Sequence, residues 1–194
     1  MDNAVESERD VVVSFDGEEL ILVDAEDQEL GYLNKAKCHD GEGVLHRAFS
    51  LFVFNADGEL LLQQRSEGKR LWPLYWSNSC CSHPRRGERM EEAAKRRLRQ
   101  EVGIEAVFDY LYKFRYQAQF DPNGAEHEMC WVYLGSSDEV PRPNRQEIVA
   151  WCWITPTRLD AELANHPERY TPWLKMEWKR LRGEFANELK SYIR

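Results

Sequence analysis

The chain has no segment apolar enough to cross a membrane and no excess of basic residues. In its 194 residues there is no run of about 18 apolar side chains, so no membrane-spanning helix is predicted. Lysine and arginine number 26 against 34 aspartates and glutamates, which gives a formal net charge of −8. Because proteins bind nucleic acids by neutralising phosphates with cations, this balance disfavours a nucleic-acid partner.

The sequence also lacks an apolar signal core and an even set of cysteines. Its first ten residues, MDNAVESERD, are acidic and polar, so export is not indicated and residues 1–10 are expected to form a flexible tail. Five cysteines, two of them adjacent, make a poor disulfide framework and favour the reducing cytoplasm. The remaining residues, 11–194, suit a single domain, since 42% hydrophobic and 31% charged residues are ordinary for a globular protein.

Hydrophobic patterning predicts alternating strands and helices. Strands are predicted over 18–24, 29–33, 47–54, 59–64, 107–120, 126–134 and 147–154. A helix is predicted over 89–102 with Gly103 at its end, and one short and one longer helix are predicted after Thr155. Residues 34–43 are predicted to form a loop. These elements favour an α/β or α+β sandwich around one core.

The segment from Cys81 to Ile104 contains an incomplete form of a phosphate-handling motif. The full motif is Gly, five residues, Glu, seven residues, then Arg-Glu-apolar-x-Glu-Glu-x-Gly-apolar. The positions that match it are Glu88, Arg96, Leu98, Glu101, Gly103 and Ile104. Ser82 stands at the position of the first Gly, and Arg97 and Gln100 stand at positions of Glu.

These replacements change what the motif can do. Hydrolysis of a diphosphate needs several carboxylates to cluster cations, whereas Arg97 adds a guanidinium suited to phosphate oxygens. Glu101 lies four residues later on the same helix face and can hold one Mg²⁺. The motif is therefore predicted to bind a diphosphate without cutting it. An ordinary i,i+4 ion pair on a surface helix explains the same two residues, and the helix alone leaves both interpretations open.

Three histidines and two glutamates are candidate metal ligands. They are His39, His46, His83, Glu126 and Glu128. Glu126 and Glu128 are two apart in a predicted strand and leave the same face, while His127 points away. Imidazole and carboxylate together suit Zn²⁺, Mn²⁺ or Fe²⁺, and an all-oxygen site would suit Mg²⁺. Each histidine alone is explained as well by an ordinary part-buried side chain, and spacing leaves their convergence open.

Cys81 is the stronger of two candidate reactive thiols. A thiol is a useful base only when its pKa is depressed, which a nearby metal or Arg97 would achieve. Cys130 lies on the same predicted strand face as Glu126 and Glu128, so spacing does not separate the two cysteines. The motif favours Cys81, because it lies at the entrance of the phosphate-handling segment. Cys80 would face the other side of an extended segment.

Further basic and aromatic residues could line a diphosphate pocket. The basic candidates besides Arg97 are Lys35, Arg65 and Lys69, and the aromatic candidates are Trp76, Tyr116 and Trp173. Taken singly, each basic residue is explained as a solvated surface charge and each aromatic as part of the core.

Together these motifs resemble one family. H-x6-H occurs at His39 and His46, W-x-N-x-x-C-x-H-P runs from Trp76 to Pro84, and E-x-E-x-C runs from Glu126 to Cys130. With the altered motif, the chain resembles type I isopentenyl-diphosphate isomerases over residues 11–173. The resemblance implies an α/β (α+β) Nudix fold, a mixed β-sheet sandwiched between helices, with an N-terminal strand extension. Ser82 departs from the glycine usual in the family between the cysteine and the histidine.

The resemblance also implies a role for each candidate residue. It makes Cys81 and Glu128 the catalytic pair, with Tyr116 beside the glutamate. It implies that the five ligands bind a divalent metal, Mn²⁺, Zn²⁺ or Mg²⁺, and that Glu101 holds a Mg²⁺ shared with the substrate. The residues implied in substrate binding are Lys35, Arg65, Lys69 and Arg97 at the diphosphate and Trp173 at the hydrocarbon.

The function predicted is the interconversion of isopentenyl and dimethylallyl diphosphates. The expected partner is a small isoprenoid diphosphate, without nucleic acid or membrane, and the expected oligomeric state is a monomer or a weak homodimer. One alternative is a Nudix hydrolase of nucleoside diphosphate derivatives, which Arg97 and Gln100 disfavour. The other is a non-enzymatic metal-binding domain, for which no motif speaks.

Overall fold

Strand β3 (His46–Phe54) is the centre of the fold in the computed structural model, which describes residues 11–193. Every side chain of β3 except Arg47 is buried, because the strand is covered on both faces. It pairs in parallel with β8 (Gly124–Ser136) and antiparallel with its other neighbours, so the sheet is mixed. The tail predicted over 1–10 lies outside the described residues, and the single domain over 11–194 stays a prediction.

Seven further strands of the described chain join β3 and β8 or extend the sheet beyond them. Those that pair directly with β3 or β8 are β1 (Glu19–Val23), β4 (Leu60–Arg65), β6 (Cys80–Ser82) and β7 (Val107–Asp121). β2 (Glu29–Asn34) extends the sheet beyond β1, and β5 (Trp76–Ser77) and β9 (Ile148–Ile154) extend it beyond β4. The helices are α2 (Lys35–Cys38), α3 (Met90–Arg97), η1 (Leu98–Val102), α4 (Pro156–Asn165), η2 (Pro167–Arg169), α5 (Pro172–Gly183) and α6 (Ala186–Leu189).

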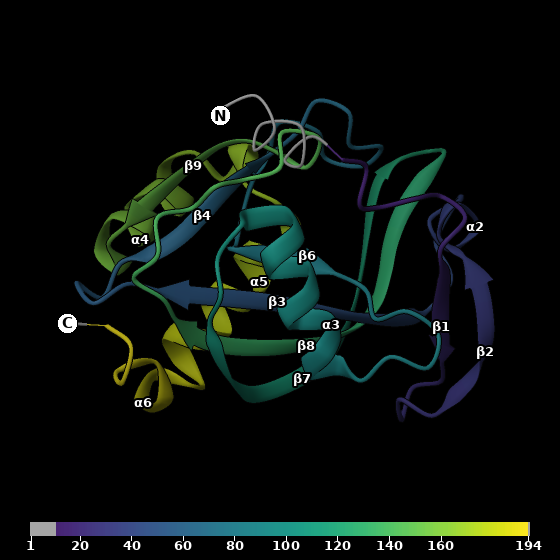
Figure 1. Ribbon diagram of the computed structural model, residues 1–194, viewed down its shortest axis with the longest axis horizontal. Helices are drawn as coiled ribbons and strands as arrows, with labels where there is room; N and C mark the ends of the chain where they lie inside the picture. Colours follow the sequence, from purple (N-terminus) through teal and green to yellow (C-terminus); the bar gives the residue numbers. More distant parts are fainter. Residues whose placement is uncertain (1–10, 194) are drawn as a thin grey trace, which may run out of the picture.

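The two faces of β3 bury different helices. Alternate side chains of the strand, Phe49, Leu51 and Val53, pack in one cluster with Ala93, Ala94 and Leu98 of α3 and η1. The intervening Phe52 and Phe54 pack in a second cluster with Leu174, Trp178 and Leu181 of α5. Figure 1 shows α3 in front of β3 and the C-terminal helices behind it. The predicted mixed sheet between helices and the predicted N-terminal strands are therefore confirmed.

Four elements differ from the sequence prediction. The helix predicted over 89–102 is α-helical only to Arg97 and continues as a π-helical turn, in which the Gly103 amide donates to Leu98 O over 3.1 Å. The loop predicted over 34–43 contains α2, whose first turn is capped by the Asn34 side chain. The helices after Thr155 form four pieces, since Pro167 and Pro172 each begin a new one. Strands β5 and β6 were not predicted.

Gly103 is required by its position. Its φ of 74° is left-handed, and a Cβ there would lie 2.3 Å from Arg142 O. A larger residue would be strained and would also displace the loop that leads to β9.

Candidate active site

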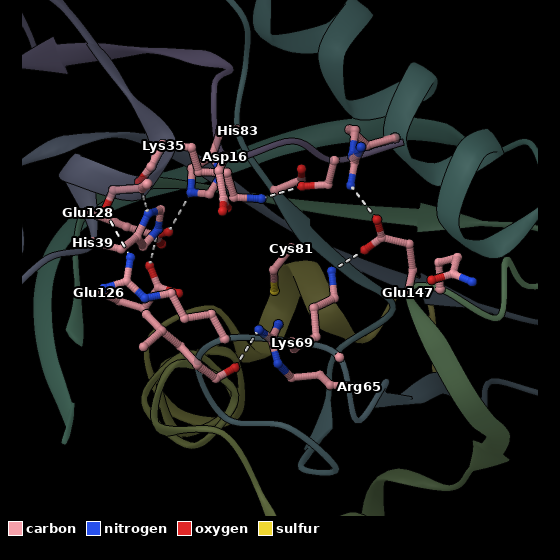
Figure 2. A pocket seen from close by; sticks show the side chains of 18 of the residues that line it. Asp16, Lys35, His39, Arg65, Lys69, Cys81, His83, Glu126, Glu128 and Glu147 are labelled. Atoms are coloured by element: carbon pink, nitrogen blue, oxygen red, sulfur yellow. Dashed lines mark hydrogen bonds and ion pairs between the residues drawn. The ribbon is translucent and has the colours of Figure 1, made fainter. Parts of the chain in front are cut away.

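A cavity of about 340 Å³ lies where β6, β7 and β8 meet α2, the loop after β4 and the start of α5 (Figure 2). The predicted site residues that line it are Lys35, His39, Arg65, Lys69, Cys81, His83, Arg97, Tyr116, Glu126, Glu128 and Trp173. His46 and Glu101 lie just behind the lining, within 3.8 Å of Glu128 and 2.6 Å of Arg97 respectively. Cys81 and Glu128 therefore share one cavity. The roles of these residues in binding and catalysis stay predictions.

The five candidate metal ligands converge at one end of this cavity. Each of them offers one ligand atom, and these atoms all lie within 4.8 Å of one another. The parallel register of β3 and β8 sets His46 opposite Glu128, and Glu126 leaves β8 on the same face. His127 points away, toward Gly43 O and Arg115, as its position in the strand predicts. Helix α2 ends at Cys38, so His39 follows directly after it, and the chain then returns to the sheet at His46, the first residue of β3. This path explains the spacing of the two histidines.

The hydrogen bonds of two histidines leave one nitrogen free for a ligand. His39 Nδ1 lies 2.7 Å from Lys35 O, and His46 Nδ1 lies 2.7 Å from Val44 O. A nitrogen so close to a carbonyl oxygen must donate, so the neutral ring presents the lone pair of Nε2 to the cluster. Within residues 11–193, His46 Nε2 is buried without a hydrogen-bond partner. A divalent cation would satisfy that nitrogen, so the residues present fit a metal.

Charge in the cluster is distributed unevenly. Burial, with the neighbouring His39, lowers the pKa of His46 to about 3, so its ring is neutral. Burial also opposes charge on His39 and Glu126, but their mutual attraction over 2.9 Å raises the pKa of His39 and lowers that of Glu126. Burial and the Glu126 carboxylate raise the pKa of Glu128 well above its ordinary value. Glu128 is thus the carboxyl in this group that most readily keeps a proton.

Tyr116 and Trp173 place Glu128 beside an aromatic wall. Tyr116 Oη donates to Glu128 Oε2 over 2.7 Å from the neighbouring strand β7. Trp173, at the start of α5, donates from Nε1 to Ser77 Oγ over 2.9 Å and meets Trp72 edge-on at 5.3 Å. These bonds fix both rings, so the cavity has a rigid apolar side next to its proton-bearing carboxyl.

Cys81 enters the cavity from the short strand β6. Its Sγ donates to Asn78 Oδ1 over 2.8 Å and lies 3.4 Å from Ser50 Oγ. Burial and then the charge of Glu177 raise its pKa well above that of a free thiol. The depressed pKa expected from the sequence is therefore not a property of the residues around the sulfur, and the thiol is the resting form. Cys80 faces the opposite way and packs in the core beside α3, as expected for an extended segment.

The other end of the cavity is basic. Lys35, Lys69 and Arg97 approach one another there, and burial together with the charges of Lys69 and Arg97 lowers the pKa of Lys35. Repulsion of this kind favours an anion between the three groups, as a diphosphate would provide. Arg65 is partly occupied, because its guanidinium donates to Leu71 O and Trp72 O.

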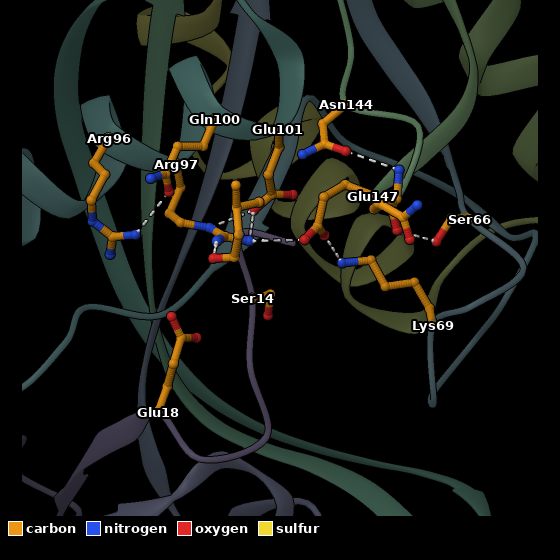
Figure 3. A network of polar contacts seen from close by, with 12 residues as sticks. Ser14, Glu18, Ser66, Lys69, Arg96, Arg97, Gln100, Glu101, Asn144 and Glu147 are labelled. Atoms are coloured by element: carbon orange, nitrogen blue, oxygen red, sulfur yellow. Dashed lines mark hydrogen bonds and ion pairs between the residues drawn. The ribbon is translucent and has the colours of Figure 1, made fainter. Parts of the chain in front are cut away.

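Two acidic residues hold Arg97 in place (Figure 3). Arg97 Nη2 lies 2.6 Å from Glu101 Oε1 and 3.6 Å from Glu147 Oε1, and Glu147 also pairs with Lys69. The i,i+4 pair that the sequence left open is therefore real, but it is buried rather than on a surface. Glu101 faces Arg97 from behind the lining, and its role at a Mg²⁺ stays a prediction.

Sequence reasoning did not select four residues that contact the site. They are Ser50, Asn78, Glu147 and Glu177. For Glu177 a signal exists, since it occupies the same face of α5 as Trp173, Leu174, Trp178 and Leu181. A glutamate on an apolar helix face indicates a buried carboxyl with a partner. Asn78 also had a signal, because it is the asparagine of the W-x-N-x-x-C-x-H-P motif, whereas Ser50 and Glu147 have no distinctive spacing.

Comparison with known proteins gives the same class. Residues 44–174 match the NUDIX domain family. A solved structure from Deinococcus radiodurans covers 91% of this chain and 100% of its own, with a TM-score of 0.65 at 25% identity. The MutT protein of Methanosarcina mazei Go1 covers 72% and 94%, with a TM-score of 0.61 at 18% identity, and supports the fold alone. Fold and site together define a protein of the Nudix class.

Curated relatives show to which family within the Nudix class the chain belongs. The Isopentenyl-diphosphate Delta-isomerase 1 of Photorhabdus laumondii is 41% identical over 163 residues, which cover 83% of this chain and 93% of that protein. The Isopentenyl-diphosphate Delta-isomerase of Halorhodospira halophila is 42% identical over 160 residues, 81% and 91% of the two chains. The chain belongs to the isopentenyl-diphosphate isomerase family of Nudix proteins, which confirms the resemblance drawn from its motifs. No helix within residues 11–193 is long and apolar enough to cross a membrane.

Proposed function

We propose that this protein interconverts isopentenyl and dimethylallyl diphosphates, a reaction of isoprenoid biosynthesis. One observation supports this above all others: Cys81 and the Tyr116-bonded Glu128 open into the same cavity, whose far end holds the basic residues. A carboxyl and a thiol facing a common space can add a proton to one carbon and remove one two carbons away.

In the direction from isopentenyl diphosphate, Glu128 gives its proton to the terminal methylene carbon. The double bond supplies the electron pair for the new C–H bond, which leaves a tertiary cation at the adjacent carbon. In this direction the pair holds one proton, which is on Glu128, and Cys81 is the thiolate. The Cys81 sulfur then takes a proton from the carbon next to the diphosphate-bearing one, and the electron pair of that C–H bond becomes the new double bond. The reverse direction uses the same groups with their roles exchanged.

The aromatic side of the cavity protects the cation. Trp173 lies in the lining, and a desolvated cation over an indole gains roughly 2 kcal/mol. The buried rings of Trp72 and Trp173 exclude water, which would otherwise trap the cation as an alcohol.

The basic end positions the substrate without cleaving it. Lys35, Lys69 and Arg97 suit the diphosphate oxygens, with Arg65 at the edge next to Trp173. Arg97 and Gln100 replace two of the carboxylates that a hydrolase would use for metal, which supports an isomerase over a hydrolase.

Two divalent ions belong to this proposal. The histidine–glutamate group would hold one, Mn²⁺, Zn²⁺ or Mg²⁺, which would polarise the Glu128 carboxyl; Glu101 would hold a Mg²⁺ together with the diphosphate. The chain's own part is to present neutral imidazoles and to orient Glu128 through Tyr116. A cytoplasmic location is proposed as well, because all five cysteines are free thiols. The proposed oligomeric state is a monomer or a weak homodimer.

The test is incubation with isopentenyl diphosphate and Mg²⁺ in D₂O, followed by proton NMR and a phosphate assay. We expect deuterium in dimethylallyl diphosphate and no phosphate release. Release of phosphate or pyrophosphate without isomerisation would support a hydrolase instead.

Three cysteine variants identify the reactive thiol. Cys81→Ala should abolish turnover, whereas Cys152→Ala, a part-exposed thiol outside the cavity, should not change it. Cys130→Ala should keep most of the turnover. If Cys130→Ala lost as much turnover as Cys81→Ala, the proposal would have assigned the base to the wrong sulfur.

A further inference from the structure

Glu177 is a fully buried carboxyl that the reaction described above does not use. It is 0% exposed and lies on the face of α5 whose other buried residues are Trp173, Leu174, Trp178 and Leu181. Among the described residues its Oε2 has no hydrogen-bond partner. Burying an ionised carboxylate in apolar surroundings costs several kcal/mol, so its presence on this face requires an explanation.

Its neighbours connect Glu177 to the reactive sulfur. Glu177 Oε1 accepts from Cys130 Sγ over 3.5 Å, and donation from Ser50 and Cys130 opposes the rise that burial causes in the pKa of Glu177. Ser50 Oγ in turn lies 3.4 Å from Cys81 Sγ and 3.4 Å from Cys130 Sγ. Ser50 therefore stands between the carboxyl of α5 and the sulfur that opens into the cavity.

A serine hydroxyl has a single proton, so the chain of bonds through it has a direction. If Glu177 is ionised, Ser50 donates to it and accepts from Cys130, and the Cys81 sulfur, whose own S–H donates to Asn78, receives no bond from Ser50. If Glu177 is neutral, its O–H donates to Ser50, and Ser50 donates to the Cys81 sulfur. A donor at the sulfur stabilises the thiolate, which is the form that takes a proton from the substrate.

We propose that Glu177 is a positioning residue of the isomerase, which in its neutral form directs the Ser50 hydroxyl at Cys81 and so gives the sulfur a hydrogen-bond donor that supports its thiolate form. This inference depends on the function proposed above. Because the sulfur takes a proton in one direction of the reaction and gives one in the other, the neutral form favours both directions equally. That equality is required, since an enzyme residue cannot change the equilibrium between substrate and product.

The charged groups around Glu177 agree with this role. Cys81 on β6, Cys130 and Glu128 on β8 and Tyr112 on β7 each have a pKa raised in part by the charge of Glu177. None of these groups is a cation. Burial, opposed by the bonds from Ser50 and Cys130, raises the pKa of Glu177 to about 8, so both forms exist near neutral pH.

The test compares three substitutions across a pH range. Glu177→Met keeps the length of the side chain but removes the donor, and should lower kcat by about tenfold or more with little change in KM. Glu177→Gln restores a donor that cannot ionise, so it should recover most of the activity that Met loses. Ser50→Ala removes the connection and should resemble Glu177→Met.

The pH profile separates positioning from a purely structural role. In the wild type, kcat should fall in both directions as pH rises past about 8, the point at which Glu177 ionises. Glu177→Gln should lack this step. Glu184→Gln, an exposed residue that pairs with Arg180 just beyond α5, is the matched control and should keep the wild-type profile.

Three outcomes would overturn the inference: an unchanged profile in Glu177→Gln, equal activity of Glu177→Met and the wild type, or a Met variant with normal kcat and raised KM. If Glu177→Met does not fold, the Gln profile alone decides. Absence of isomerisation in the wild type would reject the proposed function, which is a different result from any of these.

Discussion

Glu101 and Glu177 are equally buried carboxyls on opposite faces of the sheet, but only one of them has a cation. Glu101 is 3% exposed and lies 2.6 Å from Arg97, one turn earlier in the same helical segment. Glu177 is 0% exposed, and its hydrogen-bond partners in the described chain are the neutral side chains of Ser50 and Cys130. Burial alone therefore does not decide the charge of a carboxyl. The charge also depends on which side chains the surrounding helices and strands place beside the carboxyl.

The two carboxyls belong to two ends of one cavity with different tasks. In the proposed reaction the end at Arg97 holds a multiply charged substrate, and its acids and bases compensate one another before the substrate arrives. The end at Cys81 moves protons in that reaction, and a cationic side chain beside the sulfur would oppose the cation formed on the substrate. A carboxyl without a counter-ion is consistent with the second task and not with the first.

Removing the cation from the compensated end should have the largest effect. Arg97→Met leaves Glu101 and Glu147 buried without their guanidinium, and breaking a buried pair in this way costs about 3–5 kcal/mol. Urea unfolding measures the loss. Arg99→Met is the matched control, because Arg99 pairs with Glu105 at the surface and should lose less than about 1 kcal/mol. Equal losses in the two variants would mean that the buried pair contributes no more than an exposed one.

Removing the charge from the uncompensated end should have the opposite sign. Folding raises the pKa of Glu177 to about 8, so the native state holds a proton that the unfolded chain loses near pH 4.5. Stability must therefore decline as pH rises between these values, and Glu177→Gln avoids the decline. The variant should match the wild type near pH 4.5 and exceed it at pH 9, by up to about 5 kcal/mol. A constant difference in the free energy of unfolding at all pH values would contradict the shift.

The sequence predicts a structural feature well when the residues that cause it lie close together in the chain. Strand β3 and the hairpin to β4 were predictable, because alternating apolar residues and the turn at Asn55–Gly58 specify them within one stretch of chain. Strands β5 and β6 are two and three residues long, and their pairing with β4 and β3 sets them. A pattern so short has no period from which to predict it.

The site divides in the same way. The candidate metal ligands and Cys81 were predictable from family motifs, and the alternation of Glu126 and Glu128 was predictable from strand geometry. The raised pKa of Cys81 was not, because its causes are burial and Glu177, a residue 96 positions later in the chain. The spacing of Trp173, Glu177 and Leu181 by four would have placed Glu177 on the buried face of its helix.

The histidine–glutamate group, at the end of the cavity opposite the basic residues, should respond to metal. Mn²⁺ at one hundred times its Kd should stabilise the protein by about 2.7 kcal/mol, because the unfolded chain has no assembled site. Thermal unfolding with and without a chelator measures this. His46→Asn should lose most of the response, whereas His166→Asn, at an exposed histidine, should keep it. A full response in His46→Asn would place the ion elsewhere, for example at Glu101.

The smallest effect is expected from replacing Lys69, because this removes only one of the two cations that pair with Glu147 at the basic end of the cavity. Lys69 pairs with Glu147, but Glu147 keeps Arg97 at 3.6 Å when Lys69 is replaced. Lys69→Gln should therefore cost only about 1 kcal/mol of stability, since the amide still donates a hydrogen bond. It should raise KM for the diphosphate with little change in kcat, because the lost charge acts on binding alone. A loss of stability as large as that of Arg97→Met would show that Lys69, and not the arginine, compensates the buried acids at this end of the cavity.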